Sequence, residues 1–271
     1  MTTTETWFKI TAKHEDGDDD DASAEILLYD EIGRNWFGEG ISAEELVRTL
    51  AELDVAKIDV RINSVGGQVF EGLAIFNALD RHPAEITTHI DGMAASIASI
   101  VALAGDEVRI AENAFMMIHN PWGVAIGDAN EMRSMAEILD KLGGSLADIY
   151  AAKTGGKHNA MRKLMDAETW FNATEALEAK LVDTIAPAMA IAASVFDMTK
   201  FQNVPSSLSD RLEPATNPHG GPSRSSDAEL VRLQRLEAVA VELEDIVADA
   251  EKAEVLQVAA ESERILSLTL L

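Results

Sequence analysis

The sequence predicts an α/β protein with a mainly parallel β-sheet and a helical C-terminal extension. Along the first part of the chain, short β-branched runs alternate with segments whose apolar residues recur at helical spacing. Such alternation is typical of βαβ units, whose strands pair in parallel. After about residue 200 the composition changes, because four of the seven prolines lie at 205, 214, 218 and 222 among Ser, Asn and Gly. This stretch is typical of a linker.

Three parts result from this division. We expect residues 1–190 to form the α/β domain with an N-terminal hairpin over 7–29, residues 191–226 to form a Pro/Ser/Gly-rich linker, and residues 227–271 to form an amphipathic helical tail. The tail's heptad run is shorter than the roughly three to four heptads that indicate a coiled coil, so self-association through it stays a hypothesis. The apolar positions that predict the tail helix are Leu233, Leu236, Ala240, Leu243, Val247 and Ala250.

The elements of the domain follow from periodicity, helix caps and chain breakers. Ser42 with Glu45 forms a capping box that begins one helix. Pro83 ends another, the predicted helix Val69–Arg81. The expected strands are Trp7–Ala12, Ala24–Tyr29, Lys57–Asn63, Glu85–Asp91, Glu107–Ile110, Phe115–His119 and Leu181–Ile185. The expected helices are Ser42–Leu53, Val69–Arg81, Met93–Leu103, Asp128–Lys153 with an interruption at Gly143-Gly144, and one capped by Asn172.

Composition narrows the function classes. The net charge of −25 disfavours nucleic acid and anionic membranes as partners. The chain has no cysteine, which excludes disulfides, thiolate zinc sites and cysteine nucleophiles. The longest uncharged apolar run, residues 92–105, is shorter than the roughly 20 residues of a membrane span, and no secretory signal is visible. We expect a soluble cytoplasmic protein.

The acidic run HEDGDDDDAS (14–23) lacks calcium-loop spacing and predicts a solvated hairpin loop, with no metal site.

Ser96 is the first candidate for chemistry. It lies in GMAASIAS (92–99), a stretch of small uncharged residues between a predicted strand and a predicted helix. A serine becomes a nucleophile when a base, usually histidine, lies within hydrogen-bond reach and backbone N–H groups face the oxyanion. Ser99, one turn further on, is expected only to pack. His119 ends an apolar strand before a turn, which is where parallel sheets place functional groups.

A second turn contributes glycines. Gly66 and Gly67 follow a predicted strand and precede a helix. Glycine permits positive φ and a close approach of another backbone, so N–H groups here could face an oxyanion or a phosphate. The spacing matches neither a P-loop nor a dinucleotide fingerprint.

Four segments follow one another along the chain: RINSVGGQVFEGLAIFNAL, DGMAASIASIVALAGD, FMMIHNP and TWFNATEALEAKLVD. In this order they resemble the proteolytic subunit of the Clp protease, and most closely its phage-encoded relatives, the Clp-like prohead maturation proteases. The resemblance covers roughly residues 20–187. It implies a crotonase-like spiral of βαβ units and a serine endopeptidase whose subunits form rings around an enclosed chamber.

Carried over residue by residue, the resemblance makes Ser96 the nucleophile and His119 the general base. Gly67 and Ile97 would donate the oxyanion-hole N–H groups, and Gly66 with Gly67 would hold the substrate strand. No cofactor or metal is implied.

Two positions depart from the family pattern. Val65 stands where the family has proline, and Glu168 aligns with the catalytic aspartate. A glutamate can orient a histidine, but its additional methylene displaces the carboxylate. Three alternatives therefore stay open: Glu168 as the third member, Asp166 in its place, or a dyad without an acidic partner.

The resemblance also implies a class of substrates and a place of action. It suggests that capsid or scaffold proteins are processed during phage head maturation, inside the prohead in a bacterial host. The chain has no P-loop, so its peptidase chemistry would be ATP-independent and any unfoldase would be a separate partner. One alternative is a catalytically weak or inactive Clp-like shell that acts as a scaffold through its C-terminal helix. Another is an acyl-CoA enzyme of the crotonase type, for which no basic patch is evident.

Overall fold

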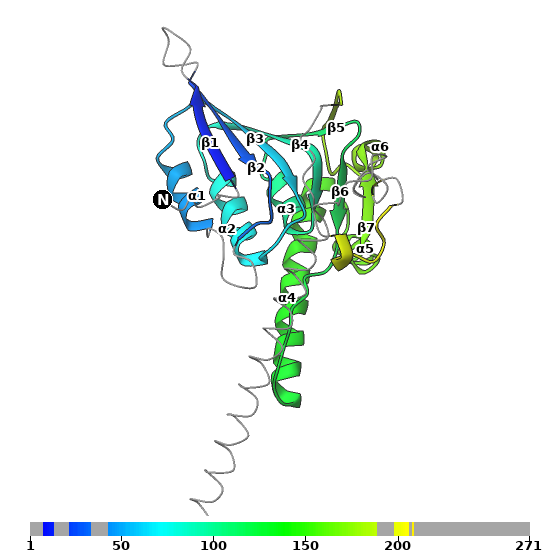
Figure 1. Cartoon of the computed structure of the whole chain (residues 1–271). Coiled ribbons are helices and arrows are strands. Elements are labelled where there is room, and N and C mark those ends of the chain that lie inside the picture. The colour runs from blue at the N-terminus through cyan, green and yellow to red at the C-terminus, as the bar shows by residue number, and fades with distance from the viewer. Residues whose placement is uncertain (1–7, 14–21, 34–42, 189–197, 206–207, 209–271) are drawn as a thin grey trace, which may run out of the picture. The chain divides into compact units, whose positions relative to one another are not determined.

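We describe the fold from a computed structural model of the chain (Figure 1). The structure describes residues 8–13, 22–33, 43–188, 198–205 and 208. Most of the predicted acidic loop, much of the predicted linker and the whole predicted tail helix lie outside these residues.

The domain is built on an eight-stranded sheet. Six strands follow the order β1-β2-β3-β4-β5-β8, while β6 pairs with β4, and β7 pairs with β6. The β1–β2 and β6–β7 pairs are antiparallel, and the other pairs are parallel. The predicted N-terminal hairpin and the mainly parallel α/β sheet are thus confirmed. The strands are β1 (Phe8–Lys13), β2 (Ser23–Leu28), β3 (Lys57–Ser64), β4 (Glu85–Ala95), β5 (Glu107–Ala111), β6 (Phe115–Ile118), β7 (Thr169–Asn172) and β8 (Thr184–Ala186).

Strand β4 is longer than the sequence predicts, and it changes partners along its length. Its first part pairs with β3 and β5, and its last part, Met93 to Ala95, pairs in parallel with β6. The prediction of a helix over Met93–Leu103 is therefore wrong at its start, because α3 begins only at Ile97. The ladder with β6 holds Met93–Ala95 extended. This places Ser96 between a strand and a helix.

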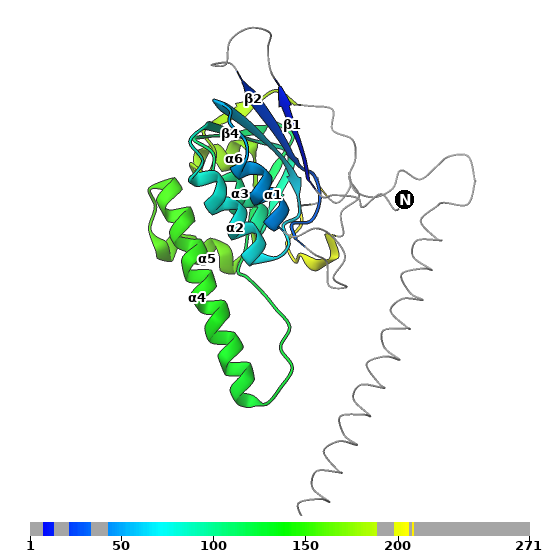
Figure 2. The ribbon, with the colours of Figure 1, turned by 90° about the vertical axis from the view of Figure 1, so that its left-hand side faces the viewer.

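The helices pack beside the sheet, and α4 projects beyond the body of the domain (Figure 2). The predicted interruption of α4 at Gly143-Gly144 is wrong, because the helix is continuous. A Cβ at Gly143 would meet the guanidinium of Arg162 on α5, which is the movable end of a long side chain. The sequence did not predict α5 or β7. The helices are α1 (Ala43–Ala51), α2 (Val69–Asp80), α3 (Ile97–Ala102), α4 (Ala129–Thr154), α5 (His158–Asp166) and α6 (Ala173–Glu178).

Two apolar cores lie on opposite faces of the β4–β6 pair, because successive strand residues point to opposite faces. Ala94 and Met116 belong to the main core with the helices, whereas their neighbours belong to a second core. Part of the predicted linker covers this second core: residues 198–205, which we call the strap, and the buried Leu208. The second core comprises Val65, Met93, Ala95, Phe115, Met117, Phe201 and Leu208.

Candidate active site

Ser96 occupies a strained turn between β4 and α3. Its φ of 55° and ψ of −130° lie where few residues other than glycine are found. Such a conformation costs about 1–3 kcal/mol and persists only where the surroundings impose it. Here Ser96 N donates to Met117 O at 3.0 Å, and Ser99 N donates to Ser96 O at 3.0 Å. The turn leaves the Ser96 side chain partly exposed.

Ser99 does more than pack, contrary to the expectation from the sequence. Its buried hydroxyl lies 2.5 Å from Ser96 O, to which it donates, and 2.7 Å from the hydroxyl of Tyr150. Tyr150, on α4, is fully buried, and burial raises the pKa of its hydroxyl. Ser99 thus fixes the carbonyl of Ser96 and links that turn to α4.

The Gly66-Gly67 turn packs directly against Ser96. A Cβ at Gly66 would lie 2.7 Å from both Ala95 O and Ser96 Cβ, and the φ of Gly66 is +89°. A Cβ at Gly67 would lie 2.1 Å from Ile32 O. Only glycine fits at either position. Ser64 supports the turn by accepting a hydrogen bond from Gly66 N at 3.2 Å.

Backbone pairing with Ile32 positions the same turn. Ile32 N donates to Gly66 O at 2.7 Å, and Gln68 N donates to Ile32 O at 2.9 Å. Within the described part of the chain, the N–H of Gly67 between them donates to no backbone carbonyl. Gly66 also lies beside the start of α3, since its added Cβ would be 3.1 Å from Ile97 N. The two predicted oxyanion donors, Gly67 and Ile97, therefore flank the contact between Gly66 and Ser96.

His119 follows β6 and faces Ser96, with its Nε2 2.7 Å from Ser96 Oγ. The parallel pairing of β4 with β6 brings together these two strand ends, although 23 residues separate Ser96 from His119. Burial lowers the pKa of His119, the negative charge of Glu168 raises it, and the positive charge of Lys200 lowers it. The balance lies below the ordinary value of 6.5. The imidazole is therefore neutral at pH 7 and can accept a proton.

The other described histidines have separate partners. His82 Nδ1 accepts a hydrogen bond from Ala84 N at 3.1 Å. His89 lies 2.8 Å from Asp59, and His158 lies 2.6 Å from Asp148. His14 and His219 are outside the described residues. Among the described histidines, His119 alone lies beside a serine hydroxyl.

Glu168 lies in the turn between α5 and β7 with a φ of 46°. Its charge acts on His119, but no hydrogen bond joins these two described side chains. Instead, Oε1 of Glu168 accepts from Gln202 N and Asn203 N, both at 2.7 Å. Trp170 Nε1 lies 3.4 Å from the same oxygen. The strap, which the sequence analysis took as linker, therefore holds the acidic residue beside His119.

Asp166, the alternative third member, points elsewhere. Its Oδ1 accepts a hydrogen bond from Asn120 Nδ2 at 2.7 Å, and the residue is exposed. Asp166 is not among the charges that shift the pKa of His119. Of the two carboxylates, Glu168 is the one that acts on the imidazole.

The part of the chain that contains this site matches the Clp protease family over residues 22–189. The chain belongs to the Clp protease family. Two similar proteins are both named ATP-dependent Clp protease proteolytic subunit 1. The one from Protochlamydia amoebophila is 35% identical over 152 residues, which are 53% of this chain and 74% of that protein. The one from Leifsonia xyli is 32% identical over 168 residues, which are 59% of this chain and 84% of that protein.

A solved structure shows the same Clp fold. It is a ClpP1 mutant from Listeria monocytogenes, with a TM-score of 0.52 and 24% identity, covering 59% of this chain and 90% of that one. By its sequence match to the family and to the two proteolytic subunits, the present chain is of the Clp proteolytic-subunit type, a peptidase. The family match ends before the strap, so the strap is additional to the shared region.

Two further findings concern the described residues alone. No helix among them is both long and apolar enough to cross a membrane. No three His, Asp or Glu side chains among them gather as a metal ion would require.

Proposed function

We propose that this Clp protease family member is a serine endopeptidase that uses Ser96 and His119. The supporting observation is the 2.7 Å separation of His119 Nε2 and Ser96 Oγ, at a strained strand-to-helix turn. A nucleophile and its base need contact of this kind, and buried imidazole in its neutral form is the required base.

The chemistry would proceed by acyl transfer. Ser96 Oγ attacks the scissile carbonyl carbon while His119 Nε2 takes the hydroxyl proton. The N–H groups of Gly67 and Ile97 stabilise the oxyanion of the tetrahedral intermediate. His119 then gives the proton to the leaving amine, an acyl-enzyme forms, and water releases it by the reverse sequence. Glu168 supplies the negative charge that stabilises the imidazolium. The steps need neither nucleotide nor metal.

Substrates would bind as extended peptides beside the Gly66-Gly67 turn. Backbone pairing with a strand-like edge is a common mode of peptide recognition.

We further propose that the substrates are capsid or scaffold proteins of a phage prohead, processed by a ring-forming homo-oligomer in the bacterial cytoplasm. The support for these finer statements is the likeness of the four quoted segments to phage-encoded members of the family. An unfoldase partner is not required by this proposal.

Intact mass spectrometry tests the proposal. Wild-type protein and the Ser96→Ala variant are each incubated with a candidate capsid or scaffold protein and weighed before and after. Fragments that form only with wild type support a Ser96-dependent endopeptidase. Fragments that form equally with both proteins contradict it. A fluorophosphonate, which phosphonylates activated serines with loss of fluoride and without needing the right substrate, gives a second readout at Ser96.

A second candidate function has one observation in its favour. Glu168 makes no hydrogen bond to His119 within the described part of the chain, so the protein could be a catalytically weak shell that serves as a scaffold. The two candidates differ in the fluorophosphonate experiment. Wild type that reacts at Ser96, with Ser96→Ala as the blank, excludes the inactive shell.

A further inference from the structure

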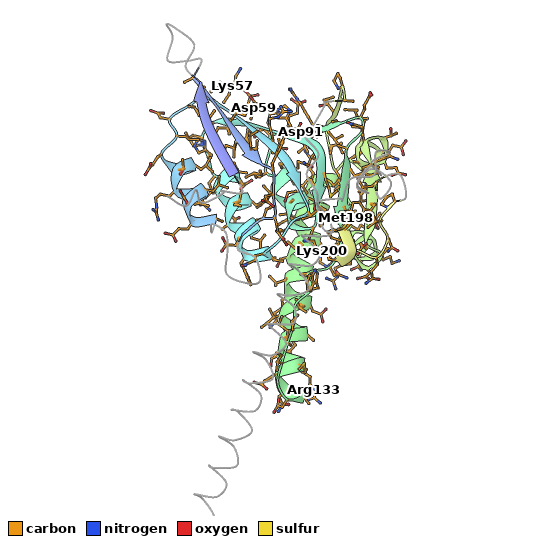
Figure 3. All side chains as sticks on the ribbon, in the orientation of Figure 1. Lys57, Asp59, Asp91, Arg133, Met198 and Lys200 are labelled. Carbon is orange, nitrogen blue, oxygen red and sulfur yellow. The ribbon has the colours of Figure 1, made fainter. Side chains whose placement is uncertain are left out.

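The strap lies against both acidic and basic members of the proposed site. It begins at the short 3-10 helix η2 (Met198–Lys200), and Figure 3 shows Met198 and Lys200 beside the body of the domain. Lys200 forms an ion pair with Glu31 at 2.9 Å, which ties the strap to the chain segment that follows β2. Phe201, next along, is 8% exposed.

The backbone of the strap donates hydrogen bonds to Glu168, the residue that aligns with the family's catalytic aspartate. Gln202 N and Asn203 N both donate to Oε1 of Glu168 at 2.7 Å. Asn203 Nδ2 also donates to Ala167 O at 2.8 Å. These three bonds converge on the turn that carries Glu168, so they fix both its backbone and its carboxylate.

The side chain of Phe201 covers the imidazole. The rings of Phe201 and His119 meet edge to face with centroids 5.9 Å apart, and Phe201 meets Trp170 in the same way at 5.5 Å. Ser96 remains partly exposed under this arrangement. The strap therefore contacts the base and the acid but does not bury the nucleophile, which argues against an inhibitory plug.

We propose that the strap is a positioning element of this active site: its backbone holds the carboxylate of Glu168 near His119, and Phe201 keeps water from the imidazole. This inference rests on the proposed function. It explains how a side chain longer than aspartate by one methylene can serve, because a carboxylate held by two N–H donors loses the freedom that its length confers.

The pKa of His119 is the first readout, measured by NMR titration of its ring in the full chain and assigned with His119→Asn. Two charged groups bear on the ring, Glu168 and Lys200. A substitution at Phe201 keeps both charges, and Lys200, whose Nζ lies 5.8 Å from the centroid of the Phe201 ring, keeps its ion pair with Glu31. Phe201→Ala admits water and should raise the pKa of His119 toward its ordinary value. Phe201→Leu keeps an apolar cover and should restore the wild-type pKa.

Leu208→Ala is the matched control. Leu208 lies in the same apolar core as Phe201, with 6% exposure, but makes no described contact with His119 or Glu168. Both alanine variants should lower the melting temperature, and only Phe201→Ala should move the pKa. An unchanged pKa in Phe201→Ala, or an equal change in Leu208→Ala, overturns the covering role.

Two substitutions test whether the strap holds the carboxylate of Glu168 in place. Glu168→Gln keeps an oxygen for the two N–H donors but removes the charge, so the pKa of His119 should fall below that of wild type. Asn203→Pro removes both the N–H donor to Glu168 and the side-chain donor to Ala167 O, and should slow fluorophosphonate labelling of Ser96 by roughly tenfold or more, a fraction of what a positioned base supplies. Wild-type labelling and wild-type pKa in Asn203→Pro overturn the holding role.

The two proposals fail in different ways. If wild type is not labelled at Ser96, the peptidase proposal fails, and the NMR pKa values still decide whether the strap controls His119. If wild type is labelled with an unaltered pH profile in every strap variant, the positioning role fails and the peptidase proposal stands.

Discussion

Gly66 shows how one residue can set the geometry of the proposed nucleophile. A Cβ there would lie 2.7 Å from Ser96 Cβ and from Ala95 O, in a backbone with φ of +89°. We expect Gly66→Ala to lower the free energy of unfolding by about 1–3 kcal/mol and to abolish labelling of Ser96. Urea unfolding and fluorophosphonate labelling measure the two effects. Gly144→Ala is the control, since its Cβ would be 3.9 Å from the nearest side chain and alanine favours a helix.

His119 makes stability depend on pH. Its pKa is lowered in the folded state by burial, so the unfolded chain takes up the proton at a higher pH. The unfolded state then binds more protons in this window, and the folded state loses stability as pH falls from above 6.5 through the folded pKa. Urea unfolding at about pH 7.5 and about pH 5.5 should show a larger loss for wild type than for His119→Asn. Equal losses would contradict the burial of a neutral imidazole.

Sequence reasoning selected Ser96 and His119, whose side chains the structure brings within 2.7 Å, because both lie within short segments that resemble one family. It misjudged the element before Ser96, since Met93–Ala95 are small or flexible residues with good helix propensity. Pairing with β6 overrides that local preference. The third member could not be settled from spacing, because Glu168 and Asp166 lie only two residues apart and the direction of each side chain depends on the turn between α5 and β7.

The strap could not be predicted from the sequence, for a different physical reason. The predicted linker that contains the strap is rich in Pro, Ser and Asn, yet Phe201 in the strap and Leu208 after it are buried. The strap's contacts with Glu168 use backbone N–H groups 34 and 35 residues away, and such donors are present in every segment. The one available signal was the recurrence of apolar residues within the predicted linker, at Met198, Phe201, Val204 and Leu208.

The α3 and α4 helices are coupled through one pair of buried hydroxyls. Ser99 Oγ lies 2.7 Å from the Tyr150 hydroxyl and 2.5 Å from Ser96 O. Tyr150→Phe should cost about 1 kcal/mol of unfolding free energy, and Ser99→Ala should cost about 1–3 kcal/mol because it leaves the tyrosine hydroxyl buried without a partner. The double variant should cost less than the sum of the two. A double-mutant cycle by urea unfolding measures the coupling, and strict additivity would show that this bond carries none.

At the scale of the whole molecule, the projecting part of α4 lacks a covering partner among the described residues. No residue of 129–142 is buried, and Arg133 marks this part in Figure 3. The preceding loop exposes Trp122 by 62% and Ile126 by 88%. Contiguous exposed apolar side chains of this kind mark association surfaces. Together with the proposed ring, they lead us to expect that copies of the chain meet through this projection.

Ile126→Asp tests that assignment because a charge at a buried subunit contact is costly. Sedimentation velocity should show wild type as an assembly and Ile126→Asp as a smaller species. Leu177→Asp adds the same charge at another exposed apolar residue, on α6 with 38% exposure, and should leave the assembly intact. Dissociation by both variants would point to added charge as the cause, and dissociation by neither would remove this loop from the contact. Ser96 labelling in the smaller species then tells whether one subunit, with its own strap, is a complete active site.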